Sequence, residues 1–211
     1  MLDLIFVLLI LTGFVFLGSG QLQFAIRTLA AQGLLLGLIP LLESGQGFWG
    51  RIISLAMLSL IIKGLVLPHL LTRAMHKSKV LREDNPFVGF TLSMMVGIFC
   101  LGGAFWLASR LPFVASTQPQ MAVAVSLFNV FVGLFVIISR RKALAQVLGY
   151  LVMENGVYIF GVALAVDVPL LVELGVLLDV FVAVFVMGIM IFHISKSFDH
   201  IDTDQLSSLV G

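Results

Sequence analysis

The stretch MAVAVSLFNVFVGLFVIIS, residues 121–139, is followed by the basic triplet Arg140-Arg141-Lys142 and then by ALAQVLGYLVMENGVYIFGVALAV, residues 143–166. Each apolar run can cross a bilayer, because a transmembrane helix takes about 20 mostly apolar residues. Two such runs joined by three cations predict a pair of transmembrane helices with a polar turn between them. This pattern decides the fold class, and the chain is predicted to be an all-α membrane protein.

The rest of the sequence has the same character. Hydrophobic residues make up 60% of the chain and charged residues 11%, whereas soluble domains carry about 25% charge. We therefore expect a polytopic helix bundle with about seven transmembrane helices. The first is expected to be retained, because no basic n-region or small-residue cleavage site marks a signal peptide. The predicted spans are residues 2–19, 23–43, 52–74, 88–109, 121–139, 143–166 and 169–194.

Basic residues are distributed unevenly between the predicted loops. One set follows the third, fifth and seventh spans, whereas the opposite side carries only Arg51 and Arg110. The positive-inside rule then places the N-terminus outside and the C-terminus in the cytoplasm, within the cytoplasmic (inner) membrane. The first set comprises Arg73, Lys77, Lys79, Arg82, Arg140, Arg141, Lys142 and Lys196. The loop 75–87 is the longest polar stretch and the best candidate for a boundary between two halves.

Four ionisable side chains fall within the predicted spans: Lys63, Glu154, Glu173 and Asp179. A charge at mid-membrane costs about 2.5–3.5 kcal/mol on insertion scales, so such residues are candidates for a function. Lys63, Glu154 and Asp179 lie near the middle of their spans and are expected at similar depth. If their helices are neighbours, these three side chains form a polar line parallel to the membrane.

Glu173 and Asp179 share the last predicted span. They are six residues apart, which is about 9 Å along a helix and about 240° around it. This offset allows one carboxylate to face the bundle and the other to face a neighbouring subunit.

Two interpretations of these charges are open. They can form a buried ion pair that fixes helix packing, such as Lys63 with a carboxylate. Alternatively, they form a proton or cation pathway, since buried carboxylates can exchange protons and a lysine beside a glutamate can share one. We favour the pathway for at least two of the four residues.

Several classes of function are disfavoured. A net charge of +1 without a basic stripe predicts no nucleic-acid partner. The sequence has no phosphate-binding glycine loop, CxxC, HExxH or GxSxG motif, so we expect no active site of its own. The single cysteine, Cys100, cannot alone form a disulfide or an iron–sulfur site. We therefore expect this chain to hold no cofactor and no metal.

Several segments share the pattern of one family: RRKALAQVLGY (140–150), MENG (153–156), PLLVELG (169–175) with Asp179, the tail IDTDQLSSLVG (201–211), and Ile62-Lys63 with Pro68. With these segments the sequence resembles the hydrogenase-4 component E family. The resemblance is specific in the C-terminal three predicted helices, looser before residue 50, and covers most of the chain.

The C-terminal three-helix unit is also similar to the small K subunit of respiratory complex I, which carries one membrane-embedded glutamate on each of two successive helices. Asp179 looks like the counterpart of the second glutamate, and Glu154 like the first, displaced by about one turn. Glu173 has no obvious counterpart. The resemblance implies an N-terminal four-helix membrane segment over residues 1–120, a K-subunit-like segment over 121–196 and a cytoplasmic tail over 197–211.

The resemblance further implies a non-catalytic subunit of a group 4 [NiFe]-hydrogenase-like or complex I-related assembly. Its partners would be antiporter-like and other membrane subunits, with the metal centres and redox chemistry in subunits other than this one. Its buried charges would contribute to proton or sodium translocation. Two other functions stay open: a structural linker that docks antiporter-like subunits, and a cation transporter that acts alone or within a multi-subunit antiporter.

Overall fold

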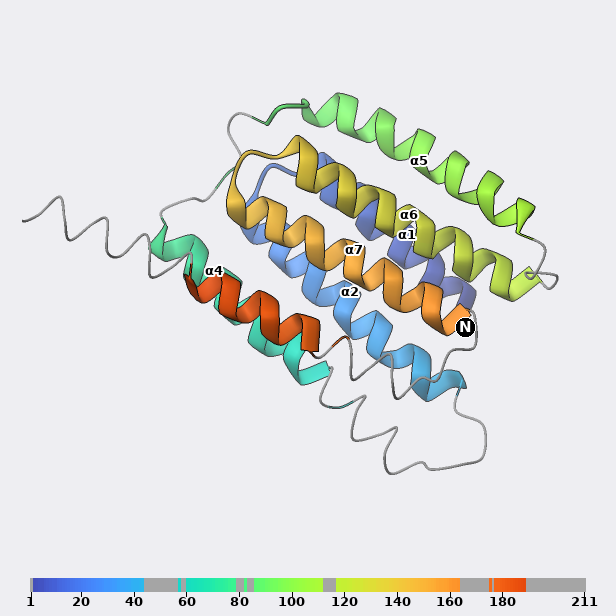
Figure 1. Ribbon diagram of the computed structural model, residues 1–211, viewed down its shortest axis with the longest axis horizontal. Coiled ribbons are helices and arrows are strands. Elements are labelled where there is room, and N and C mark those ends of the chain that lie inside the picture. Colours follow the sequence, from blue (N-terminus) through green and yellow to red (C-terminus); the bar gives the residue numbers. More distant parts are fainter. Residues whose placement is uncertain are drawn as a thin grey trace, which may run out of the picture.

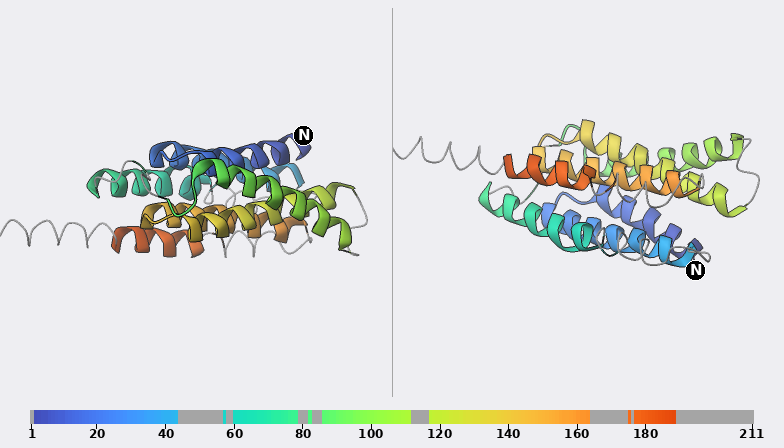
Figure 2. Two further views of the ribbon diagram at one scale, coloured as in Figure 1. Left: turned by 90° about the horizontal axis from the view of Figure 1, so that it is seen from above. Right: turned by 60° about the horizontal axis from the view of Figure 1, so that its bottom comes forward.

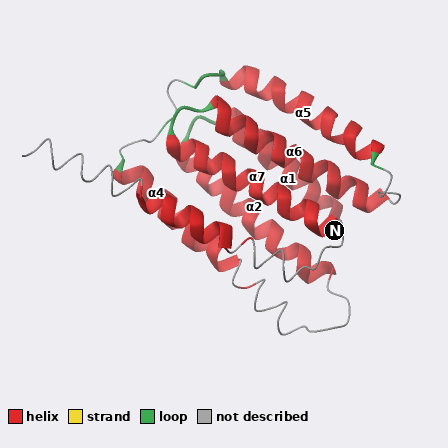
Figure 3. Ribbon diagram, in the orientation of Figure 1, coloured by secondary structure: helices red, strands yellow, loops and turns green. Residues whose placement is uncertain are grey.

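The computed structural model describes residues 2–43, 57, 60–78, 82, 86–111, 117–163, 175 and 177–188. Within this part of the chain the regular elements are helices, and no strand occurs (Figure 3). The helices run along a common direction and pack side by side as a bundle (Figure 1, Figure 2). The predicted all-helical fold is therefore confirmed for these residues.

Each predicted span contains one described helical stretch. The elements are α1 (Leu2–Gly18), α2 (Leu22–Glu43), the π-helical turn η1 (Ile62–Val66) continuing into α4 (Leu67–Lys77), α5 (Phe90–Arg110), α6 (Thr117–Ser139), α7 (Ala143–Ala163) and the helix Leu177–Gly188. Four of the described helices contain stretches long and apolar enough to cross a membrane, namely Leu22–Ile39, Phe90–Arg110, Gln120–Ser139 and Ala143–Gly161. The chain is thus a multi-pass membrane protein, while the count of seven spans and the orientation of the termini stay predictions.

Helices α6 and α7 form the tightest pair in the bundle. A Cβ atom on Gly156 would lie 2.7 Å from the Ser126 carbonyl oxygen, and one on Gly149 would lie 3.0 Å from the Gly133 carbonyl oxygen. Only hydrogen fits at these places, so the two backbones approach closely, as is common between membrane helices. This close approach fixes α7, which carries Glu154 and Asn155, against α6.

Helix α2 connects several parts of the bundle. It packs on α1, η1, α4 and α7, whereas α5 lies at one edge against α1 and α6 (Figure 1). Helix α5 is mostly exposed, with Phe99 76% and Trp106 62% accessible. Because these side chains are apolar, we interpret the outer face of α5 as a surface for lipid or another membrane subunit.

Several connections meet at one end of the bundle. The Phe87 amide donates a hydrogen bond to the Ser139 carbonyl, and Gln21 pairs with Arg82 in an isolated bridge. The basic positions Arg82 and Arg140 therefore lie at the same end, in agreement with the prediction from the positive-inside rule that their two loops lie on one side of the membrane. Lys79 and Lys196 lie outside the described residues.

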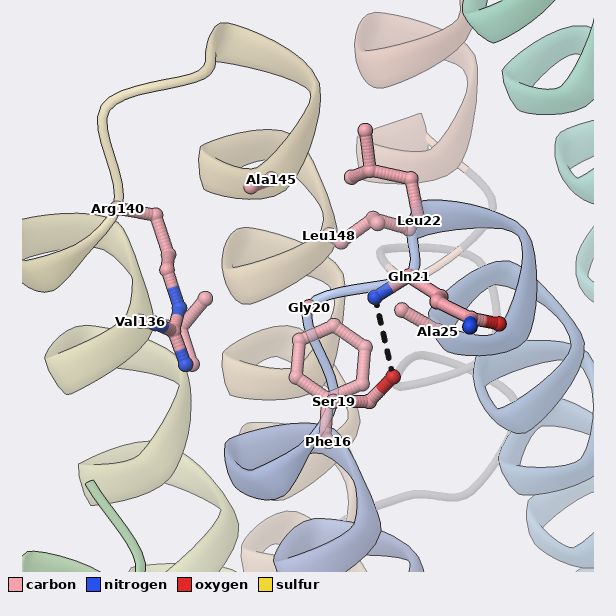
Figure 4. Close-up of a pocket in the computed structure, with 10 residues that line it drawn as sticks. All are labelled: Phe16, Ser19, Gly20, Gln21, Leu22, Ala25, Val136, Arg140, Ala145 and Leu148. Atoms are coloured by element: carbon pink, nitrogen blue, oxygen red, sulfur yellow. Dashed lines mark hydrogen bonds between the residues drawn. The ribbon is translucent and has the colours of Figure 1, made fainter. Parts of the chain in front are cut away.

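Arg140 connects three segments at this end through hydrogen bonds. Its side chain is 3% exposed and donates hydrogen bonds to the carbonyls of Leu17, at 3.0 Å, and Val88, at 3.3 Å. Leu17 lies in the last turn of α1, where the carbonyls have no partner within the helix. Figure 4 shows Arg140 beside the α1–α2 turn, whose geometry is held by a hydrogen bond from the Gln21 amide to the Ser19 hydroxyl. We assign Arg140 a structural role.

Candidate functional site: a buried charge cluster

Lys63 lies in the π-helical turn η1, directly before α4. Pro68 has no amide hydrogen and its ring would clash with the carbonyl four residues earlier, so the chain cannot continue as a regular α-helix through this turn. The Leu67 amide instead donates to the carbonyl of Ile62, five residues back. A Cβ atom on Gly33 of α2 would lie 2.8 Å from the Lys63 Cβ, so only glycine lets η1 approach α2 this closely.

The structure brings Lys63 together with two of the three predicted carboxylates. Lys63 Nζ lies 2.7 Å from Oε1 of Glu154 on α7 and 3.9 Å from Oδ1 of Asp179 on the helix Leu177–Gly188. The exposed fractions of these side chains are 9%, 4% and 0%. The three residues therefore meet as a buried cluster, as expected if their helices are neighbours. Glu173 lies outside the described residues.

Some carboxylate oxygens of the cluster accept no hydrogen bond from the described residues. Among the described residues, Oε2 of Glu154 and both carboxylate oxygens of Asp179 have no hydrogen-bond partner. A cavity of about 10 Å³ borders this place, close to the minimum space for one water molecule. Its lining consists of Leu29, Gly33, Lys63, Leu67, Leu151, Asn155 and Asp179. The arrangement thus combines one cation, two carboxylates and space beside the less strongly paired carboxylate.

A chain of uncharged polar side chains continues from Lys63 into the bundle. Lys63 Nζ donates to Asn155 Oδ1 at 3.1 Å, and Asn155 Nδ2 donates to Gln32 Oε1 at 3.4 Å. Gln32 Nε2 donates to Thr12 Oγ1 at 2.9 Å and to Asn129 Oδ1 at 3.3 Å. Gln32 and Asn129 are both 0% exposed. The polar line therefore extends across α7, α2 and α6 to α1.

The predicted site residues did not include four polar side chains of this chain, Thr12, Gln32, Asn129 and Asn155. The predicted residues were ionisable groups within the spans, whereas these four side chains carry no charge. The available signal was the presence of amide side chains within apolar runs, since such groups commonly form hydrogen bonds between membrane helices. That signal indicates a polar contact but not its partner, which depends on how the helices pack.

The described residues offer no evident metal centre. No group of three histidine, cysteine, aspartate or glutamate side chains converges among them. In the charge cluster, the Lys63 ammonium lies 2.7 Å from the Glu154 carboxylate and 3.9 Å from the Asp179 carboxylate, so a cation is already present beside both. Carboxylates buried beside an ammonium are groups that can in general gain and lose protons.

Comparison with known proteins identifies the family. The sequence model of the NADH-ubiquinone/plastoquinone oxidoreductase chain 4L family matches residues 121–211, which include Glu154 and Asp179. An uncharacterized protein of Mycobacterium tuberculosis is 32% identical over 95% of this chain and 92% of its own length. Hydrogenase-4 component E of Escherichia coli K12 is 31% identical over 72% of this chain and 70% of its own length. No solved structure gives a significant match. The chain belongs to the hydrogenase-4 component E family.

Proposed function

We propose that this protein is a membrane subunit of a complex I-related, hydrogenase-4-like redox complex in the cytoplasmic membrane. In this proposal Lys63, Glu154 and Asp179 take part in proton or sodium translocation, which is driven by electron transfer in partner subunits. The family membership supports the assembly, and the buried cluster of one lysine and two carboxylates supports the role within it. The chain itself is proposed to be non-catalytic and to hold no cofactor.

The charge of the cluster is the observation that carries this proposal. If all three groups are ionised, one positive and two negative charges leave a net charge of −1. An uncompensated charge is costly in an apolar interior. Uptake of one proton, or of one monovalent cation, neutralises the cluster, and its release restores the charge. The cluster can therefore hold one exchangeable cation at a time.

The position of Asp179 suggests how the cluster reaches other subunits. Its helix buries Val182 and Val186 but exposes a broad apolar face, including Phe181 at 65% and Val184 at 66%. An exposed face beside the cluster is suitable for contact with another membrane subunit. Antiporter-like subunits are the proposed partners, and Glu173 is proposed as the ion-transfer group toward them.

A structural linker is the second candidate. The short Lys63–Glu154 ion pair favours it, because a buried pair on two helices can fix their packing without any transport. The two functions differ in whether the carboxylates are needed for ion translocation or for assembly of the complex.

The test uses the native complex, purified through this subunit and reconstituted in vesicles. Glu154→Gln and Asp179→Asn are expected to assemble with all partners and to sustain electron transfer while losing ion translocation per electron. Ser126→Ala is the matched control, since the Ser126 hydroxyl is buried and, among the described residues, bonds only to the Val123 carbonyl of its own helix. Normal ion translocation in both carboxylate variants would refute the residue assignment, and failure of both to assemble would favour the linker.

A further inference from the structure

Three amide side chains connect the charge cluster to the backbone of α6. Asn155, Gln32 and Asn129 follow one another from Lys63, and the last amide, Asn129 Nδ2, donates to the Val125 carbonyl at 2.8 Å. Positions 32, 129 and 155 belong to three different helices, so these residues come together only when the chain folds. The exposed fractions of the three side chains are 0% for Gln32 and Asn129 and 3% for Asn155.

The two ends of this chain fix the direction of every hydrogen bond in it. A backbone carbonyl can only accept, so Asn129 must turn its NH₂ group to Val125 and its oxygen to Gln32. Gln32 then donates to Asn129 and turns its own oxygen to Asn155. At the other end an ammonium can only donate, so Asn155 must offer its oxygen to Lys63 and its NH₂ group to Gln32. Both ends require the same orientation of the amides.

We propose that Asn155, Gln32 and Asn129 form a positioning chain that holds the Lys63 ammonium against Glu154. This inference rests on the proposed function, because it names the residues that orient one member of the ion-transfer cluster. The amides themselves are positioning residues and do not carry ions, since they neither gain nor lose a proton under ordinary conditions.

The geometry at Lys63 explains what such a chain achieves. An ammonium has three hydrogens and a flexible four-carbon stem. Two donor directions are taken by Glu154 and Asn155, at 2.7 and 3.1 Å. Oδ1 of Asp179 lies farther from the same nitrogen, at 3.9 Å. A fixed Asn155 therefore keeps the Lys63 ammonium close to both carboxylates.

Gln32 is the branch point of the chain. Each of its two amide hydrogens has an acceptor, Thr12 Oγ1 and Asn129 Oδ1, and Thr12 is in turn anchored by donation to the Leu9 carbonyl. Loss of Gln32 would leave buried polar groups without hydrogen-bond partners on both sides, which is unfavourable in an apolar interior. Asn155 would then be free to turn away from Lys63.

Solid-state NMR on the full-length chain in lipid tests the proposal. Lysine labelled with ¹⁵N at Nζ and asparagine labelled with ¹³C at Cγ give a through-space contact for Lys63 and Asn155, which Asn155→Leu assigns by removing it. The contact is expected to persist in Ser126→Ala and to be lost in Gln32→Leu, although Gln32 does not touch Lys63. An undiminished contact in Gln32→Leu would overturn the proposal.

A second pair of variants keeps the test decisive if Gln32→Leu does not fold. Asn129→Gln retains an amide whose oxygen can accept from Gln32 and whose NH₂ group can donate to a carbonyl, whereas Asn129→Leu retains neither. The contact is expected in the first and lost in the second, and equal behaviour of the two would refute the chain. The readout is independent of transport: if Glu154→Gln and Asp179→Asn translocate ions normally, the proposed function fails while the positioning of Lys63 can still be seen.

Discussion

Lys63 is the residue on which the site depends. Its ammonium pairs with Glu154 at 2.7 Å and lies near Asp179, and the three side chains come from separate helical segments. The Lys63 ammonium neutralises the charge of the nearby Glu154 carboxylate, whereas it neutralises the charge of the more distant Asp179 carboxylate only in part. This imbalance distinguishes the cluster from a simple buried ion pair, because it leaves a place for one further positive charge.

Removing the lysine is expected to destabilise the protein. Lys63→Met leaves two buried carboxylates without their cation, and breaking a buried pair costs about 3–5 kcal/mol. The second change Glu154→Leu removes one of the orphaned carboxylates, so we expect the double variant to regain part of the lost stability. The free energy of unfolding can be measured by denaturant titration in detergent micelles. A double variant that is less stable than Lys63→Met would contradict this view of the pair.

Sequence reasoning reached the charged residues but not their amide partners. Lys63, Glu154 and Asp179 were identified because a charge in a transmembrane segment is costly and therefore informative. Gln32 and Asn129 have no such cost as single residues, and their importance comes from the partners that the fold supplies. The third predicted carboxylate, Glu173, lies outside the described residues and stays a prediction.

At the scale of the elements, the π-helical turn and its contact with α2 set the position of Lys63. Gly33→Ala places a methyl group where only 2.8 Å separates it from the Lys63 Cβ. We expect a loss of about 1–3 kcal/mol, typical of overpacking, together with a weakened Lys63–Asn155 contact in the NMR experiment.

Gly103→Ala is the matched control for this prediction. Gly103 lies in α5, and a Cβ there would meet no heavy atom within 4 Å. Stability is expected to be unchanged or slightly raised, since alanine favours the helix. If Gly33→Ala behaves like Gly103→Ala, η1 does not depend on this close approach.

The helices themselves were predictable, whereas the π turn was not. Apolar runs of about 20 residues identify membrane segments without any knowledge of neighbours. From the sequence, a proline at position 68 indicates only that a helix kinks or ends there. The π-helical turn before Pro68 depends on which backbone carbonyls accept hydrogen bonds. How closely that turn approaches α2 depends on the glycine at position 33.

At the scale of the whole molecule, the loops carrying Arg82 and Arg141 lie at one end of the bundle. Helix α5 begins at this end, shortly after Phe87, whose amide bonds to the Ser139 carbonyl. It runs to the opposite end of the bundle, where it ends at Arg110 (Figure 1). All three arginines are exposed. The orientation of the bundle in the membrane can therefore be measured from these positions.

Cysteine labelling provides that measurement. In a background where Cys100 is replaced by alanine, Arg82→Cys and Arg141→Cys are expected to react with a membrane-impermeant maleimide only in inverted vesicles. Arg110→Cys is expected to react in intact spheroplasts, because the positive-inside rule places it outside. Labelling of all three positions from the same face would show that α5 does not cross the membrane.

The bundle has exposed apolar faces on α5 and on the helix Leu177–Gly188, which a multi-subunit membrane assembly can cover. In the proposed function, its buried charges serve ion movement that is coupled to electron transfer in that assembly. The central claim is that the carboxylates of the cluster change their protonation or cation occupancy in step with the redox state of the complex.

Infrared difference spectroscopy of the assembled complex, recorded between its oxidised and reduced states, tests this claim most directly. We predict a carboxyl band that shifts in deuterated water, disappears in Asp179→Asn and persists in Ser126→Ala. A difference spectrum whose carboxyl region is the same in the wild type, Glu154→Gln and Asp179→Asn would contradict the claim.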